Sequence, residues 1–173
     1  EIVDAKDTIS NNESPTKAIK DKPQSTLAVA CDICHVRDDV DGLISAGSTG
    51  ALLTGAILKI GRLPGVLRPA LSPILPSGSS GYVALCDSGA NVDCKPEYLA
   101  QFAVMAAAFM KAVSGVENPR VALVSVGEED KKGNELTHAA FELIKQTKLN
   151  FVGNMEARYA LSGDYDVLVC DGF

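Results

Sequence analysis

The chain has 173 residues, of which 46% are hydrophobic, and carries a formal net charge of −6. This size and composition allow a buried core and predict a globular protein, and the negative charge argues against a general nucleic-acid binder. No apolar run approaches the roughly 18 residues of a membrane span, and no secretory signal opens the chain. The five cysteines are an odd number, which favours reduced thiols and a cytoplasmic location.

The two ends of the sequence are abrupt. The first residue is Glu1 rather than methionine, and a strand-like run, 166–171, stops just before Phe173. We therefore expect residues 1–173 to be a single α/β domain fragment whose sheet continues in a longer protein.

In chain order, residues 1–5 predict a short strand. Ser14 and Pro15 then resemble an N-cap with proline at the first helical position, which predicts a helix through about Ile19. Residues 25–36 predict a second helix that is apolar nearly all round.

Within that second helix, Cys31, Cys34 and His35 have the spacing of a c-type haem attachment or of a CxxC redox pair. The strand that usually precedes such a redox motif is missing. Small cysteines on a buried helix pack as modest hydrophobes, so we expect these thiols to be core residues that bind neither haem nor metal.

Residues 42–46 predict a strand, which leads into a glycine-rich turn and an apolar helix over 51–60. A strand, turn and helix in this order can cradle phosphate, because glycine lets the backbone approach and the helix N-terminus supplies donors. The alternative is a tight turn with a Ser/Thr cap. The residues of the turn are Gly47, Ser48, Thr49 and Gly50.

This turn lies in a stretch without acidic residues. No Asp or Glu occurs from Gly42 to Cys86, whereas Lys59, Arg62 and Arg68 are present. A locally positive segment on an acidic molecule is a candidate docking face for an anionic partner.

A proline-rich crossing follows, in which residues 69–75 predict an irregular edge strand. Residues 82–86 predict a buried strand, and a long helix is expected over 96–113. The loop between them gathers four polar side chains, which favours a functional role. Binding of a metal by two of its acids is one alternative, and turn formation by Asp and Asn is another. These side chains belong to Asp87, Asn91, Asp93 and Lys95.

Residues 121–126 are a β-branched apolar run, typical of a strand buried on both faces. Acidic residues 128–130 place negative charge where a following helix would begin, and this helix is expected from Asn134 to about 147. Lys131 and Lys132 oppose the dipole of such a helix. Either they are solvated surface residues, or an anion binds between a lysine and backbone N–H groups.

The chain ends with a short strand over 150–152, a helical turn over 156–161 and a strand over 166–170. Four predicted strands end beside a glycine: Gly47, Gly89, Gly127 and Gly172. In a parallel α/β sheet the ligand crevice lies outside the carboxyl ends of the strands, so all these loops should line one edge. The sequence therefore predicts an α/β fold with a layered, mainly parallel sheet.

Six segments resemble the PlsX-type phosphate acyltransferases of bacterial phospholipid synthesis, in family order and with family-like spacing. They are ISAGSTGAL (44–52), GRLPGVLRPAL (61–71), DSGANVDCKPE (87–97), EDKKGNEL (129–136), FVGNMEAR (151–158) and VCDGF (169–173). The family usually has Asn in place of Ser48 and Thr in place of Glu128. Its N-terminal glycine-rich strand and its C-terminal half are missing, so the chain resembles roughly the middle half of the family.

The resemblance implies a homodimer with an isocitrate/isopropylmalate dehydrogenase-like fold that uses no cofactor or metal. It implies conversion of acyl-[acyl carrier protein] and inorganic phosphate to acyl phosphate, in the cytoplasm or peripheral to the inner membrane face. Phosphate is the nucleophile, so no catalytic Ser, Cys or His is needed, and we expect His35 and His138 to lie away from the loops. Lys132 matches the family's catalytic lysine, and a second catalytic asparagine would follow Phe173.

The remaining site residues are assigned in the same way. Phosphate or substrate binding falls to the two polar loops together with Asn134 and Asp171, whereas the acid-free run from Gly42 to Cys86 is what assigns carrier-protein docking to Lys59, Arg62 and Arg68. Two alternatives stay open: a phosphate acyltransferase that acts on short-chain acyl-CoA, and a carrier-protein-binding module without chemistry of its own.

Overall fold

The computed structural model describes residues 1–79 and 81–173. By its contacts the chain forms two compact units, an N-terminal unit (residues 1–69) and a C-terminal unit (residues 70–173). The single domain expected from the sequence stays a prediction.

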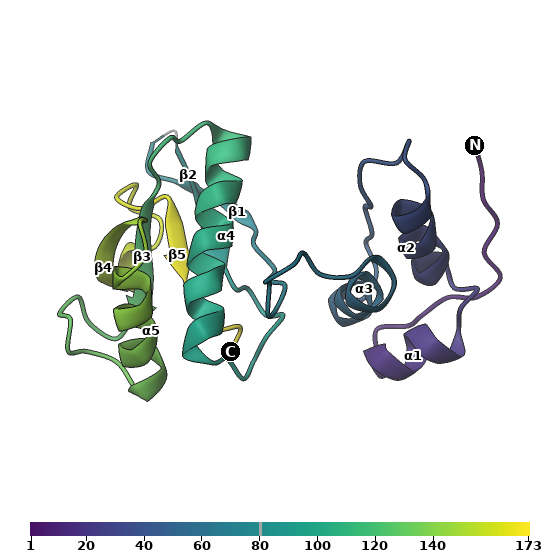
Figure 1. Ribbon diagram of the computed structural model, residues 1–173, viewed down its shortest axis with the longest axis horizontal. Coiled ribbons are helices and arrows are strands. Elements are labelled where there is room, and N and C mark those ends of the chain that lie inside the picture. Colours follow the sequence, from purple (N-terminus) through teal and green to yellow (C-terminus); the bar gives the residue numbers. More distant parts are fainter. Residues whose placement is uncertain (80) are drawn as a thin grey trace. The chain divides into compact units, whose positions relative to one another are not determined.

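The N-terminal unit is a small cluster of helices (Figure 1). It contains α1 (Pro15–Asp21), α2 (Thr26–Val36) and α3 (Thr49–Gly55), and α3 continues directly into a π-helix, η1 (Ala56–Ile60). These helices pack around a core of Ile19, Leu27, Cys31 and Ala51. The helix starts expected at Pro15 and after Ser25 are confirmed, and the Ser25 side chain caps α2 by accepting from the Ala28 N–H at 3.4 Å.

Two strands expected in this unit are wrong. Residues 1–5 and 42–46 are irregular, and the described part of the unit contains only an isolated bridge between Asp7 and Ser25. A strand is completed by backbone hydrogen bonds to a neighbour, and neither segment has one within the unit. Ile44 is accordingly fully exposed.

The C-terminal unit is built on a five-stranded sheet with the order β1-β2-β5-β3-β4. Strands β2, β5, β3 and β4 are parallel, and β1 pairs antiparallel with β2 at one edge. The strands are β1 (Ile74–Ser77), β2 (Gly81–Cys86), β3 (Arg120–Ser125), β4 (Asn150–Glu156) and β5 (Val167–Val169). The mainly parallel α/β sheet expected from the sequence is confirmed.

Two helices, α4 (Pro96–Ser114) and α5 (Glu135–Lys145), lie side by side on one face of this sheet (Figure 1). The core between helices and sheet includes Phe102, Met110, Leu123 and Ile144. A second cluster, formed around Val83, Ala122, Met155 and Leu168, is buried on the other face. Because both faces of the central strands are covered, their sequences are continuous apolar runs rather than alternating ones. None of the described helices is long and apolar enough to cross a membrane.

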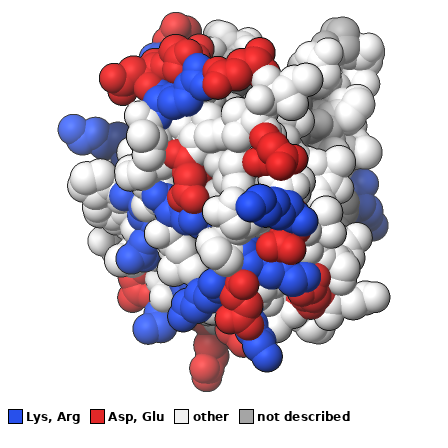
Figure 2. All heavy atoms as spheres, turned by 90° about the vertical axis from the view of Figure 1, so that its right-hand side faces the viewer, with Lys and Arg blue, Asp and Glu red and all other residues white. Residues whose placement is uncertain are grey.

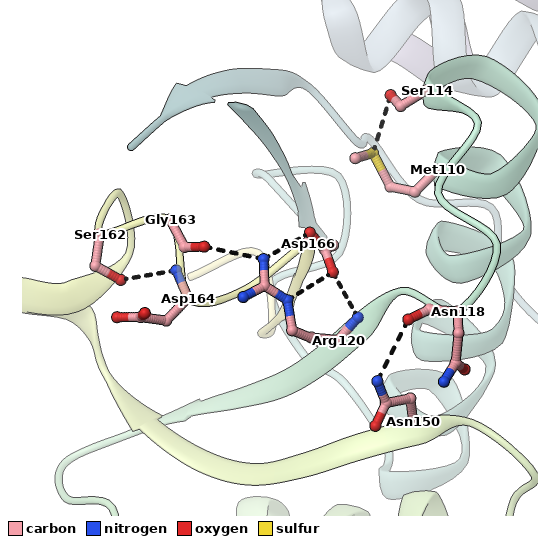
Figure 3. Close-up of polar contacts among 9 residues, drawn as sticks. All are labelled: Met110, Ser114, Asn118, Arg120, Asn150, Ser162, Gly163, Asp164 and Asp166. Atoms are coloured by element: carbon pink, nitrogen blue, oxygen red, sulfur yellow. Dashed lines mark hydrogen bonds and ion pairs between the residues drawn. The ribbon is translucent and has the colours of Figure 1, made fainter. Parts of the chain in front are cut away.

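The amino ends of the parallel strands are held by an ion pair (Figure 3). The Arg120 guanidinium donates twice to the Asp166 carboxylate, at 2.9 Å each, and once to the Gly163 carbonyl at 2.9 Å. Burial raises the pKa of the Asp166 carboxyl, but the hydrogen bonds and charge of Arg120 outweigh burial and hold that pKa below its usual value. This pair ties β3 to the start of β5, at the end of the sheet opposite the candidate site.

Candidate active site at the carboxyl edge of the sheet

The carboxyl ends of β2, β3 and β5 meet at one edge of the C-terminal unit because these strands are parallel. Three of the four glycine-marked strand ends, at Gly89, Gly127 and Gly172, therefore lie as expected. The fourth, at Gly47, is wrong because residues 42–46 form no strand.

A pocket of about 530 Å³ opens at this edge, between α4, β3, α5 and the last residues of the chain. Its apolar wall includes Leu99, Leu123, Leu136 and Phe173, and its polar side includes Ser125, Asn134, Thr137 and Asp171. The volume falls within the range typical of small-molecule sites, and a mixed lining of this kind suits a ligand with an apolar body and a polar end.

Asp87 organises the loop that follows β2. Its side chain is 1% exposed, and both carboxylate oxygens accept hydrogen bonds. One oxygen accepts from the Leu71 N–H at 2.7 Å, and the other accepts from the N–H groups of Ala90 and Asn91, at 3.0 and 2.6 Å, and from the Asn91 amide at 3.1 Å. These bonds occupy the carboxylate with its own chain, which favours the turn-forming interpretation of Asp87 over metal or phosphate binding.

The same loop is joined to the segment after β5. The Gly172 N–H donates to the Asn91 carbonyl at 2.8 Å, and the Asp87 N–H donates to the Cys170 carbonyl at 3.0 Å. A Cβ at Gly172 would come within 2.8 Å of an Asp87 carboxylate oxygen, so only glycine fits this approach. This junction places the partly buried Asp171 in the wall of the pocket.

The other polar residues of this loop face outward. Asp93 and Lys95 are exposed, and Lys95 is the N-cap residue of α4, which begins at Pro96. Within residues 1–79 and 81–173, no three His, Cys, Asp or Glu side chains are placed to hold a metal ion together. A role of Asp93 and Lys95 in substrate binding stays a prediction.

The helix expected from Asn134 is confirmed, whereas the acids 128–130, expected beside its first turn, lie in the loop before it. Helix α5 begins at Glu135 and is capped by Asn134: the Thr137 N–H donates to the Asn134 Oδ1 at 2.9 Å, and the Asn134 N–H donates to the Thr137 Oγ1 at 2.9 Å. Such a reciprocal box satisfies two backbone N–H groups and outweighs the attraction of acids for a helix start. Residues 126–134, here called the lysine loop, therefore lie outside α5.

The end of the lysine loop depends on Gly133. This residue has a φ of +119°, where L side chains are strained, and a Cβ there would overlap the Thr137 hydroxyl. Glycine therefore lets the loop turn sharply into the capping box, which brings Gly133 and Asn134 to the rim of the pocket.

Both lysines of the loop are exposed, and neither is among the residues that line the pocket. The Lys132 carbonyl accepts from the Ser125 hydroxyl at 3.2 Å, which fixes Lys132 above the end of β3. Its aliphatic stem lies against Gly127, because a Cβ there would come within 2.9 Å of the Lys132 Cγ. The lysine backbone is thus held at the carboxyl edge, and Lys132 is exposed to solvent there.

The lysine loop has two further contacts that sequence reasoning missed. His138 was expected to lie away from the loops, and this is wrong: its Nε2 lies 3.0 Å from the Lys131 carbonyl oxygen. The buried Asn154 of β4 donates its amide to the Glu129 carbonyl at 2.9 Å. The contact of His138 could have been predicted from the sequence, because His138 lies one helical turn after the cap residue Asn134 and so faces the preceding loop.

In the N-terminal unit, the turn at 47–50 forms the Ser/Thr cap that was the alternative to a phosphate cradle. The Ser48 hydroxyl accepts from the Ala51 N–H at 3.3 Å, and Thr49 and Gly50 are already the first residues of α3. The Gly47 N–H is likewise bonded within the turn, to the Ser45 hydroxyl at 3.2 Å. Phosphate binding by this turn stays a prediction.

The candidate docking residues belong to the same unit. Lys59 pairs with Asp32, with its ammonium 2.8 and 2.7 Å from the two carboxylate oxygens, so its charge is compensated. The Arg62 guanidinium donates to the Leu67 carbonyl. On the face shown in Figure 2, basic and acidic side chains are interspersed. Docking of a partner by Lys59, Arg62 and Arg68 stays a prediction.

Alanine at both Cys31 and Cys34 should leave the full-length protein folded, and the protein should show no haem absorbance before or after the change. Cys31 is fully buried in the N-terminal core, and burial raises the pKa of its thiol. The fraction of reactive thiolate is therefore small. Absorbance spectroscopy and a thermal melt check this expectation, and a Soret band in the purified protein would contradict it.

Together, the mainly parallel sheet and the polar loops at its carboxyl edge define an α/β protein with the fold of the phosphotransacylases. The EutD phosphotransacetylase from Staphylococcus aureus aligns with a TM-score of 0.64 at 20% identity, over 93% of this chain and 61% of that one. A phosphotransacetylase from Streptococcus pyogenes aligns with a TM-score of 0.58 at 19% identity, over 73% of this chain and 44% of that one. At such low identity these likenesses show the fold alone.

Sequence comparison gives the family. The model of the fatty acid synthesis protein family matches residues 1–173. A phosphate acyltransferase from Clostridium acetobutylicum is 53% identical over the whole chain, and one from Clostridium perfringens is 52% identical over 99% of it. The chain therefore belongs to the PlsX-type phosphate acyltransferase family. It spans about half the length of these relatives, 52% and 50%.

Proposed function

We propose that the full-length protein transfers an acyl group from acyl-[acyl carrier protein] to inorganic phosphate and so supplies acyl phosphate for phospholipid synthesis. Family membership over the whole chain is the observation that carries this proposal. The arrangement of the lysine loop, the capping box and an apolar-walled pocket at one sheet edge supports it.

The chemistry needs no nucleophilic side chain. A phosphate oxygen attacks the thioester carbonyl carbon, the carbonyl oxygen takes up negative charge, and the carbon–sulfur bond breaks as the carrier thiolate leaves with its electron pair. The protein must hold the phosphate against the thioester and stabilise the developing charge. A cation on Lys132 and polar groups at Gly133 and Asn134 are suited to these tasks.

The pocket supports an acyl chain longer than acetyl. Val126, Leu136 and Phe173 give the pocket accessible apolar surface beside its polar rim, and such surface contributes binding in proportion to the area it buries. An acetyl group would leave most of this apolar surface in water. Transfer from short-chain acyl-CoA is the alternative, because the solved structures with a similar fold include phosphotransacetylases.

Hydroxylamine trapping tests the proposal. Full-length protein is supplied with phosphate and either long-chain acyl-[acyl carrier protein] or short-chain acyl-CoA, and acyl phosphate is captured as hydroxamate. We expect phosphate-dependent hydroxamate with the carrier-protein substrate. Hydroxamate from short-chain acyl-CoA alone would favour the alternative, and none from either donor would contradict the proposed function.

Replacing Arg62 and Arg68 with glutamate should slow association with the carrier protein at low salt and weaken the dependence of the on-rate on salt. Carrier proteins are strongly acidic, and complementary charge acts mainly on the rate of encounter. Stopped-flow measurement over a salt series gives this rate. The double variant Lys145→Glu/Lys148→Glu changes the net charge equally through exposed residues of the C-terminal unit. Equal on-rates for the two double variants would exclude Arg62 and Arg68 from docking.

Two further parts of this proposal follow from the family resemblance: a homodimeric state and a cytoplasmic enzyme that associates peripherally with the inner membrane face. Light scattering of the full-length protein and its co-sedimentation with anionic vesicles test them. A monomer at micromolar concentration would contradict the first, and failure to sediment at low salt would contradict the second.

A further inference from the structure

We propose that Asn154 is a positioning residue that anchors the lysine loop over the carboxyl edge of the sheet. The expected effect of Asn154 on turnover rests on the function proposed above, whereas its effect on the position of the lysine loop does not. Asn154 lies on β4, where it pairs in register with Leu123 of β3, and it is 6% exposed.

A single carbonyl oxygen links Asn154 to the lysine. The Glu129 carbonyl accepts from the Asn154 amide at 2.9 Å and from the Lys132 N–H at 2.9 Å. The buried side chain of one strand thus fixes the turn that carries Lys132, although the two residues are 22 positions apart in the sequence. Hydrogen bonds shielded from water are stronger than exposed ones, so this link is the firm point of the turn.

Apart from the capping box at its end, the lysine loop is held by two further side-chain contacts between described residues, and both are exposed. The Ser125 hydroxyl meets the Lys132 carbonyl at 3.2 Å, and the His138 ring meets the Lys131 carbonyl at 3.0 Å. Water competes for both of these carbonyls. Residues 128–134 are themselves exposed, so burial of apolar side chains does little to hold them. The position of the loop therefore depends strongly on Asn154.

Stability alone gives no reason for an amide at this place. The Asn154 Oδ1 is buried and has no hydrogen-bond partner among the described residues. A buried polar atom without a partner is destabilising, and an apolar side chain of similar size would avoid that penalty. What the amide adds is a donor aimed at the Glu129 carbonyl. Asn154 does not line the pocket, so its action runs through the loop rather than through contact with substrate.

Limited proteolysis of the full-length protein tests the anchor without reference to activity. Trypsin cleaves after Lys131 and Lys132 only when the loop opens, so the cleavage rate reports how often it does. In Asn154→Ala we expect cleavage at these two lysines to rise about fivefold relative to cleavage after Lys148, the ratio that loss of one hydrogen bond produces. Asn154→Asp, which keeps the shape and loses the donor, should give at least the same rise.

Asn150→Ala is the matched control. Asn150 lies on the same strand, and its amide also donates to a backbone carbonyl, that of Asn118 at 3.3 Å, but at the opposite end of the sheet (Figure 3). It should leave cleavage at Lys131 and Lys132 unchanged. The same variants are then assayed: Asn154→Ala should lower kcat with little change in KM for the acyl donor, because the displaced group acts in the transition state.

The outcomes separate the two proposals. Unchanged cleavage at the two lysines in Asn154→Ala, or an equal rise at every tryptic site, would overturn the anchor even if the enzyme is active. A selective rise in cleavage in a protein that forms no acyl phosphate would support the anchor and contradict the proposed function. A selective rise with kcat unchanged would overturn the part of the inference that concerns turnover.

Discussion

Alanine in place of Lys132 should lower turnover of the full-length protein by about two orders of magnitude or more, the scale of losing one electrostatic stabiliser in an active site. The backbone of Lys132 is fixed to Ser125 and Glu129 at the carboxyl edge, next to the Gly133 turn that leads to the pocket. Its ammonium group is thus tethered close to the place where phosphate and thioester should meet.

Lys131→Ala is the control for this prediction and should be mild. Successive residues of a turn point in different directions, so the two lysines are not expected to serve one ligand equally. Steady-state kinetics of both variants, with thermal melts to show that they are folded, give the comparison. Equal activity of the two variants, or a Lys132→Ala protein that has merely unfolded, would leave Lys132 without a catalytic role.

Asp87→Ala should destabilise the protein by about 3 kcal/mol or more. The change removes the acceptor for four donors, three of them backbone N–H groups, at a site that is 1% exposed. Each buried donor left without a partner costs about 1–3 kcal/mol. Asp87→Asn should also destabilise the protein. Its NH2 group takes the place of one carboxylate oxygen and cannot accept hydrogen bonds from the N–H groups that surround it.

Urea unfolding of the full-length protein measures this effect, and Asp93→Ala provides the matched control in the same loop. Asp93 is exposed, so its removal should change the free energy of unfolding by no more than about 0.5 kcal/mol. An Asp87→Ala protein as stable as the Asp93→Ala protein would refute the view that Asp87 organises the loop, and a role in ligand binding would then be the better explanation.

The strands of the C-terminal unit could be predicted because their signal is local. Strand β3 is a run of apolar residues buried on both faces, and β2 reads in the same way, so each was found within one or two residues of its bounds. Residues 42–46 carry a similar short apolar signal but have no neighbouring strand in the N-terminal unit. A segment becomes a strand only when it can pair with a neighbouring strand, and the sequence of the segment alone does not determine whether such a neighbour exists.

The candidate site could be predicted only in part, for the same reason. The polar loops are marked by glycine and by charge, and parallel strands bring three of them to one edge. The contact of Asn154 with Glu129 depends instead on the order β5-β3-β4 and on the register of β4, which no local pattern encodes. The start of α5 could be predicted, because the helix expected from Asn134 begins one residue later and Asn134 caps it.

Mass spectrometry of the product formed from isotopically labelled phosphate tests the central claim most directly. The full-length protein is supplied with long-chain acyl-[acyl carrier protein] and with phosphate that carries heavy oxygen at every position. If a phosphate oxygen attacks the thioester carbonyl, the acyl phosphate keeps every labelled oxygen, and its amount falls sharply in the Lys132→Ala protein. Free fatty acid as the sole product, or an acyl phosphate that has lost one labelled oxygen, would contradict acyl transfer to phosphate at this site.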